Sequence, residues 1–175
     1  MEYLIEVMPQ LLVGALTTLK LFLFTLIGSL PLGIVLALGL SLHFKPLRYL
    51  LQTYVWVMRG TPLLLQLIFI FYGLPTIGIV FDRFEAALIA FILNYAAYFA
   101  EIFRGGIQSI PQGQYEAAQV LQLSPFQTVT KIVIPQVTKI VLPSVGNEVI
   151  NLVKDSSLIY ILAVSYTHLT LPTTE

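Results

Sequence analysis

The chain has 175 residues, of which 57% are apolar and only 10% are charged, and its formal net charge is zero. Its mean hydropathy of +0.87 is far from that of soluble domains, so we expect the bilayer to be its solvent. The balanced charge gives no reason to expect a nucleic-acid partner, and the absence of cysteine excludes disulfides, thiol nucleophiles and cysteine-based zinc sites.

The first predicted membrane span is residues 21–42, which contain no charged side chain. A helix of this length, at about 1.5 Å per residue, crosses the roughly 30 Å hydrocarbon core. The ten residues at the start of the chain include two glutamates and no lysine or arginine. Since a secretory signal begins with basic residues, we expect this first span to be retained.

The second predicted span is composite. Thr61 followed by Pro62 predicts a helix start, with Thr61 capping its free amides. The apolar run that follows meets Pro75 too early to cross the bilayer alone, so we expect residues 54–58 also to lie at membrane depth. Residues 74–85 are then predicted to form a loop on the outside.

The third span is predicted at residues 86–103, and a fourth hydrophobic region covers residues 140–164. The fourth contains charged residues, each of which costs about 2.5–3.5 kcal/mol at the middle of a membrane. We therefore expect this region to be broken, around Gly146, or to face the protein interior.

Basic residues are distributed unevenly over the connections. Three occur at 43–59, one at 74–85 and three at 104–139. Because cytoplasmic loops carry the excess of lysine and arginine, we predict that the N-terminus is outside and that residues 104–139 are in the cytoplasm.

The cytoplasmic connection is polar, yet its pattern predicts two short helices. The first is expected at 114–123. Ser124 and Pro125 predict the start of the second, which Pro135 is expected to close. Two short helices joined at a sharp corner would form a knob that docks on a partner; an ordinary solvated helix is the alternative.

This connection resembles the EAA loop in the membrane subunits of bacterial ATP-binding-cassette importers. Glu116, Ala117 and Ala118 match its opening, and Ile132 and Pro135 match its close. The words RGTPLLLQ (59–66), AAYFAEIFRGGIQSIPQGQ (96–114) and GNEVINLVKDSSL (146–158) are similar to the subfamily that serves polar amino acids such as histidine, arginine and glutamine. Four matches in the right order are specific, whereas EAA alone would be weak.

One position departs from the family pattern. The family usually places glycine six residues after the glutamate, where this chain has Gln122. Glycine at a helix end supports a positive φ. The detailed geometry of the corner is therefore open.

The resemblance implies an all-α, polytopic transmembrane helical bundle with a cytoplasmic coupling-helix loop. Residues 1–164 would form a type-1 permease domain without its final span, and residues 165–175 are interpreted as a non-native tail. The implied function is the permease subunit of an importer in the bacterial inner membrane, which is not an enzyme. No cofactor or metal is expected on the chain, which has no GxxxxGK[ST] phosphate loop, so a partner ATPase would use the ATP.

The resemblance also implies partners. They are a second permease, identical or a sister chain, two ATPase subunits, an extracytoplasmic amino-acid-binding protein and the lipid of the membrane. The predicted contact with the ATPase consists of Glu116, Ala117, Ala118, Gln122, Ile132 and Pro135.

Two polar stripes are candidates for the substrate path. Asn94, Tyr98 and Glu101 have helical spacing on the third span, and Asn147, Asn151 and Lys154 have it on the fourth. Of these, all but Glu101 are assigned to the path. Glu101 and Arg104 are instead predicted to form a gating or structural ion pair, and Tyr95 is expected to pack. The alternative is that the polar groups pair with one another for helix packing.

Two other function classes compete. An ATP-independent secondary transporter or a channel fits the polar stripes equally well and fails mainly on the docking loop. A membrane-embedded enzyme has little support, since HExxH and GxSxG are absent and the carboxylates Glu101, Glu148 and Asp155 lack a paired histidine.

Overall fold

The computed structural model describes residues 2–159, and every element in that range is helical. This range contains seven α-helices, with π-helical and 3-10 turns after α3, between α6 and α7 and after α7. Their bounds are α1 Glu2–Ser41, α2 Lys45–Gly60, α3 Leu63–Ile68, α4 Arg83–Gln108, α5 Gln112–Val120, α6 Pro125–Thr128 and α7 Ile134–Asp155. The segment interpreted as a tail, residues 165–175, lies outside the described residues.

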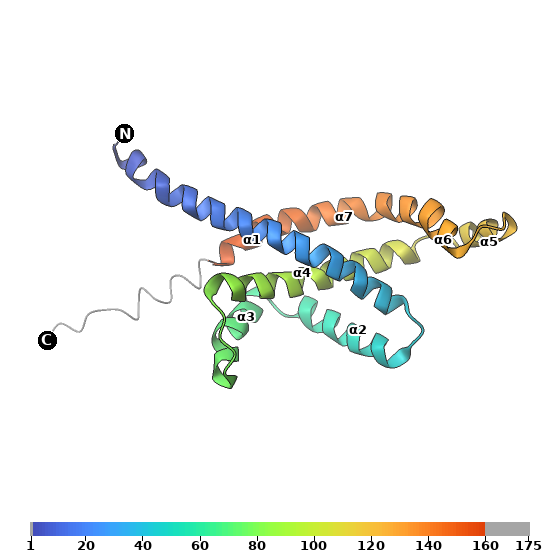
Figure 1. The fold of residues 1–175 in the computed structure, drawn as a ribbon, viewed down its shortest axis with the longest axis horizontal. Coiled ribbons are helices and arrows are strands. Elements are labelled where there is room, and N and C mark those ends of the chain that lie inside the picture. Colours follow the sequence, from blue (N-terminus) through green and yellow to red (C-terminus); the bar gives the residue numbers. More distant parts are fainter. Residues whose placement is uncertain (1, 160–175) are drawn as a thin grey trace.

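Helix α4 is the centre of the fold, with α1, α2, α3 and α7 packed around it (Figure 1). Its buried face is rich in alanine, which lets neighbouring helices approach closely, as is usual between helices in membranes. Three aromatic side chains of α4, Phe91, Tyr95 and Phe99, are fully or almost fully buried in the core. Large aromatic side chains such as these bury much apolar area in a core.

The predicted spans correspond to observed helices. Residues 12–41 of α1 and all of α4 are long and apolar enough to cross a membrane. Helix α2 and residues 63–77 meet the same measure only as a pair, bent by 105°. This is consistent with a composite second span, and the membrane depth of residues 54–58 stays a prediction. Among the described residues, α7 is not a candidate membrane span, because it is too polar.

One prediction about proline is wrong, and of the two alternatives given for the fourth region the break around Gly146 is excluded. Helix α7 is continuous through Gly146, because glycine lowers helix propensity without ending a helix that neighbours hold in place. Pro135 does not close the second cytoplasmic helix. It lies in the first turn of α7, where its missing N–H is tolerated, and a π-helical turn at Val129–Val133 links α6 to α7.

The close contact between α1 and α4 depends on Gly33. A Cβ added there would lie 2.6 Å from the Cβ of Phe99 and 3.2 Å from backbone atoms of Ala96 and Ala100. A Cβ at Gly146 would meet nothing within 4 Å. We expect Gly33→Ala to lower the free energy of unfolding by about 1–3 kcal/mol, the usual cost of overpacking.

Gly146→Ala is the matched control and is expected to raise the free energy of unfolding by up to about 1 kcal/mol through helix propensity. Unfolding of the two purified variants in detergent, followed by circular dichroism, gives the comparison. Equal effects of both substitutions would contradict the packing described for Gly33.

Candidate functional site

The break between α2 and α3 is caused by Pro62 and held by side chains. Pro62 has no N–H to donate to the carbonyl of Met58, four residues earlier. That carbonyl instead accepts hydrogen bonds from Gln66 Nε2 and Asn94 Nδ2, both at 2.9 Å. Asn94 Nδ2 also donates to Gln66 Oε1 at 3.1 Å. The amide of Asn94 thus fastens the break to α4.

Thr61 has a different role from the one predicted. The residue before α3 is Pro62, and no side chain caps this helix. The Thr61 hydroxyl donates to the Val57 carbonyl at 2.8 Å and accepts from Gln66 Nε2 at 2.7 Å. Thr61 therefore joins the network that stabilises the break, and the prediction of an amide cap is wrong.

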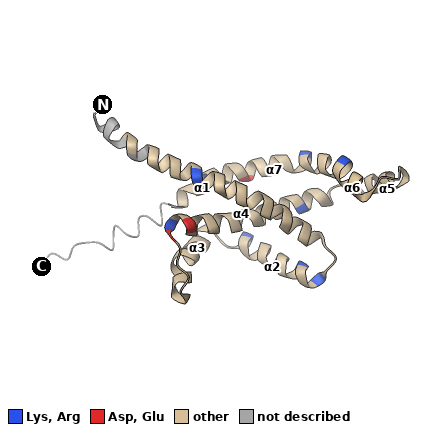
Figure 2. Ribbon diagram, in the orientation of Figure 1, with Lys and Arg blue, Asp and Glu red and all other residues tan. Residues whose placement is uncertain are grey.

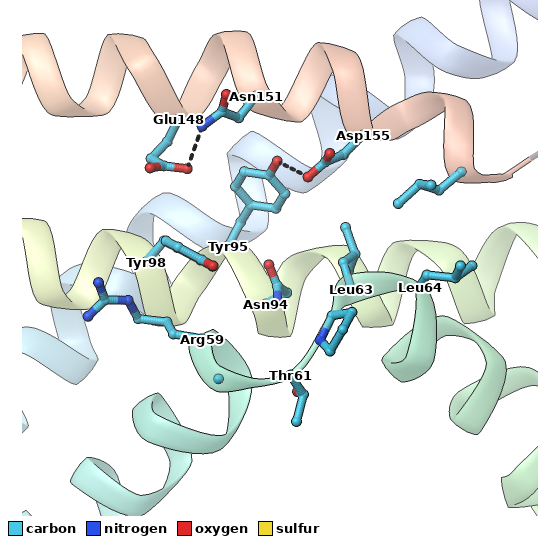
Figure 3. Close-up of a pocket in the computed structure, with 13 residues that line it drawn as sticks. Arg59, Thr61, Leu63, Leu64, Asn94, Tyr95, Tyr98, Glu148, Asn151 and Asp155 are labelled. Atoms are coloured by element: carbon cyan, nitrogen blue, oxygen red, sulfur yellow. Dashed lines mark hydrogen bonds between the residues drawn. The ribbon is translucent and has the colours of Figure 1, made fainter.

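A cavity of about 590 Å³ lies between the break, α4 and α7 (Figure 3). It has both polar and apolar walls. Its polar lining residues are Arg59, Thr61, Asn94, Tyr95, Tyr98, Glu148, Asn151 and Asp155. The Asn94 oxygen points toward α7, away from the break that its nitrogen holds (Figure 3).

The two sides of this cavity carry opposite charges. On the α2 side, the Arg59 guanidinium carbon lies 5.3 Å from the centre of the Tyr98 ring, a cation–π distance. On the α7 side are the carboxylates of Glu148 and Asp155. Asp155 Oδ2 accepts a hydrogen bond from the Tyr95 hydroxyl at 2.7 Å. The cavity can therefore receive a ligand that carries both a positive and a negative group.

The structure brings together only part of the predicted substrate path. Asn94, Tyr98 and Asn151 line the cavity, whereas Asn147 and Lys154 are exposed and do not. The face of α7 toward the cavity contains Glu148, Asn151 and Asp155, at i, i+3 and i+7. This stripe shares Asn151 with the predicted one. Helical spacing alone therefore could not decide which of the two stripes faces the cavity.

Arg59, Glu148 and Asp155 were not assigned to the path from the sequence. The signal that could have found Arg59 is its place three residues before Pro62, where a helix break brings the end of α2 to the cavity. Tyr95 packs as predicted, being 2% exposed, but it also positions Asp155.

Glu101 and Arg104 form the predicted ion pair on α4. Arg104 Nε lies 2.9 Å from Glu101 Oε2, and a second bond joins Nη2 to Oε1. The pair lines a second cavity of about 440 Å³, which also includes Arg59. Arg59 therefore borders both cavities; whether the pair has a gating role stays a prediction.

The cytoplasmic corner forms despite the missing glycine. Gln122 adopts the left-handed conformation, with φ of 53°, the value for which glycine is usual. The Leu123 N–H bonds to the Ala118 carbonyl and the Gln122 N–H to the Gln119 carbonyl, at 3.0 and 2.9 Å. These are the two bonds of a Schellman motif, so glutamine reproduces the corner.

The start of the next helix follows the prediction. Ser124 and Gln127 form a reciprocal capping box at the start of α6, with Pro125 in its first turn. Of the predicted docking residues, Glu116 and Ala117 are exposed, whereas Ala118 is buried and Ile132 is half-buried. Pro135 is exposed at the start of α7.

The tip of the corner exposes large apolar side chains. Val120 is 83% exposed, Leu121 is 69% exposed and Phe126 is 76% exposed. They lie beside Glu116 and Ala117 on the α5–α6 corner, which projects beyond the long helices (Figure 1). Contiguous exposed apolar groups of this kind mark a surface that another molecule covers.

Comparisons with known proteins agree with this geometry. Residues 29–171 match the family described as binding-protein-dependent transport system inner membrane component. The putative glutamine transport system permease protein GlnP of Rickettsia bellii is 41% identical over 162 residues, 90% of this chain and 74% of its own length. The arginine transport system permease protein ArtQ of Bacillus subtilis is 39% identical over 157 residues, with 89% and 72% covered.

A solved structure extends the likeness to the fold. The crystal structure of an amino acid ABC transporter with histidines superposes with a TM-score of 0.84 at 35% sequence identity, covering 92% of this chain and 75% of that one. The arrangement of helices described above is thus that of an importer's membrane subunit.

Proposed function

Because this chain belongs to the binding-protein-dependent transport system inner membrane component family, and so is a transport permease subunit of an ATP-binding-cassette importer, we propose that it carries polar amino acids into the cell. The relatives named above are described as carrying glutamine and arginine. The observation that carries the proposal is the cavity with opposite charges on two sides. Its charged residues can pair with both the carboxylate and the ammonium group of an amino acid.

An amino acid that leaves water must keep its carboxylate and its ammonium group paired. Arg59 supplies a cation for the carboxylate. Glu148 and Asp155 supply anions for the ammonium, with the Asn94 oxygen and the Asn151 side chain as further polar groups. The volume of about 590 Å³ accommodates an amino acid with a polar side chain.

Energy for import comes from a separate ATPase subunit, as in the rest of the family. We propose that this subunit binds the α5–α6 corner through the apolar tip and Glu116. The tip lies outside the candidate spans, so lipid does not account for its exposed Val120 and Phe126. Ala117 beside them lets a partner backbone approach closely.

The distribution of charge supports the proposed orientation. Basic residues gather at the α1–α2 turn and toward the α5–α6 end, while acidic and basic residues occur together at the opposite end of α4 (Figure 2). That end contains Asp82, Arg83 and Glu85. With the positive-inside rule, this distribution supports the proposal that the α5–α6 corner is in the cytoplasm and the N-terminus is outside. The chain is a component of the bacterial inner membrane.

A second permease completes the path in this proposal, because the few spans of one chain cannot enclose it. The assembly would hold two permeases, identical or sister chains, two ATPase subunits and an extracytoplasmic binding protein that delivers the amino acid. The partner permease would close the side of the cavity that one copy leaves open.

Reconstitution tests the function. The permease, co-purified with the ATPase subunit of its own operon, is placed in liposomes with the binding protein outside and ATP inside. We expect ATP-dependent uptake of at least one of glutamine, arginine, histidine and cystine, and no uptake of leucine. Uptake that continues without ATP would instead support the secondary transporter or channel, and import of leucine alone would contradict the polar substrate class.

A further inference from the structure

A polar cavity of about 600 Å³ lies where the cytoplasmic ends of α1, α2 and α4 meet α5. Ser41, Arg48, Gln108 and Tyr115 are among its lining residues. The side chain of Arg48 makes no hydrogen bond or ion pair with any other residue of the part of the chain that the structure describes, whereas its backbone N–H bonds to the Phe44 carbonyl. The cavity therefore offers an uncompensated positive charge.

A second cavity of about 610 Å³ adjoins it between α1, α4 and α7. Its lining is almost entirely apolar and includes Ile34, Phe103 and Leu142. Ile107 and Tyr115 line both cavities, so the polar cavity and the apolar one lie side by side.

The position of the pair matches one leaflet of the bilayer. In the orientation proposed above, the polar cavity lies at the cytoplasmic interface and the apolar groove rises from it along two membrane helices. Ile34 and Leu142, on opposite sides of the groove, are both exposed, so the groove opens toward the lipid.

We propose that these two cavities bind one anionic phospholipid of the cytoplasmic leaflet, with its phosphate beside Arg48 and an acyl chain in the groove. Charge complementarity selects this occupant. A helix of a second copy could fill the apolar groove, but an apolar helix brings no anion to Arg48. Cytoplasmic leaflets are rich in anionic lipid, and each basic side chain near them adds to its attraction.

The proposal has a consequence for the docking corner. Tyr115, which touches both cavities, precedes Glu116 in α5. A bound lipid would therefore contact the helix that carries the ATPase-docking residues and hold it against the ends of α1 and α2.

Lipid binding is measured directly, without ATP or substrate, so its outcome is separate from that of the transport assay. The purified permease–ATPase complex is titrated with phosphatidylglycerol or with phosphatidylethanolamine, and retained lipid is counted by native mass spectrometry. We expect phosphatidylglycerol to be preferred, and Arg48→Gln to weaken its binding about fivefold. Lys139→Gln removes an exposed cation outside both cavities and is expected to change nothing.

Leu142→Trp fills the groove from an exposed position and should also release the lipid, whereas Ile150→Trp, exposed on α7 outside the groove, should not. Equal retention of the two lipids by the unaltered complex would overturn the proposal, as would unchanged binding by Arg48→Gln. Because the chain has no cysteine, Leu142→Cys provides a further check. A disulfide between two copies through this residue would show that the groove is a protein interface.

Discussion

Arg59→Gln is expected to lower the initial rate of amino-acid uptake by roughly 30- to 150-fold. The substitution leaves the substrate carboxylate without its cation inside the membrane, and an unpaired charge of this kind costs about 2–3 kcal/mol, with tenfold for each 1.4 kcal/mol. Arg59→Lys keeps the charge but loses the planar stacking on Tyr98, so its loss should be smaller. Uptake into liposomes at a substrate concentration below saturation measures both.

Lys154→Gln provides the matched comparison, because helical spacing assigned Lys154 to the path and the structure leaves it exposed outside the cavity. Its uptake should stay within about twofold of the unaltered protein. If Lys154→Gln lost as much uptake activity as Arg59→Gln, the cavity would not be the substrate path. The result would instead favour the stripe of α7 that was predicted from the sequence.

Val120→Asp is expected to weaken association with the ATPase subunit. Burying a valine contributes about 1.5–3 kcal/mol, and an aspartate at the same position would place a carboxylate in the interface. We therefore expect the affinity to fall by at least about tenfold, with uptake lost in parallel. Co-purification from detergent and titration of the ATPase measure the change.

The control for this substitution is Val80→Asp. Val80 is 75% exposed, close to the value for Val120, but it belongs to the loop at the opposite end of α4. Association should be unchanged in this variant and reduced again in Glu116→Lys, whose charge reversal falls on the same corner. Retention of the ATPase by both Val120→Asp and Glu116→Lys would place its binding surface elsewhere.

Features set by local composition could be predicted from the sequence. The uncharged run at 21–42 lies within α1 except for its last residue, and the early Pro75 led to the prediction of a composite second span, with which the two helices bent by 105° are consistent. Ser124 and Pro125 start a helix as their capping chemistry dictates. Each of these depends on residues close together in the chain.

The site itself depends on contacts between distant residues. Asn94 donates to the carbonyl of Met58, 36 residues away, and nothing in the local pattern shows that Pro62 leaves that carbonyl without a partner. Polar residues fall on two overlapping stripes of α7, and only its packing against α4 decides that Glu148 and Asp155 face the cavity. The rule that a proline ends a helix gives the wrong result at Pro135. The π-helical turn before it, which links α6 to α7, has no recognisable sequence signature.

The unbroken helical path from Pro125 to Asp155 gives the docking corner mechanical leverage. At about 1.5 Å per residue this path is a rod roughly 45 Å long, with the proposed ATPase surface at one end and the carboxylates of the cavity at the other. A tilt of about five degrees at the corner would displace the far end by about 4 Å, more than the length of a hydrogen bond. Motion too small to disturb the packing of the corner would then be enough to separate Asp155 from Tyr95 and change which charges a passing amino acid meets.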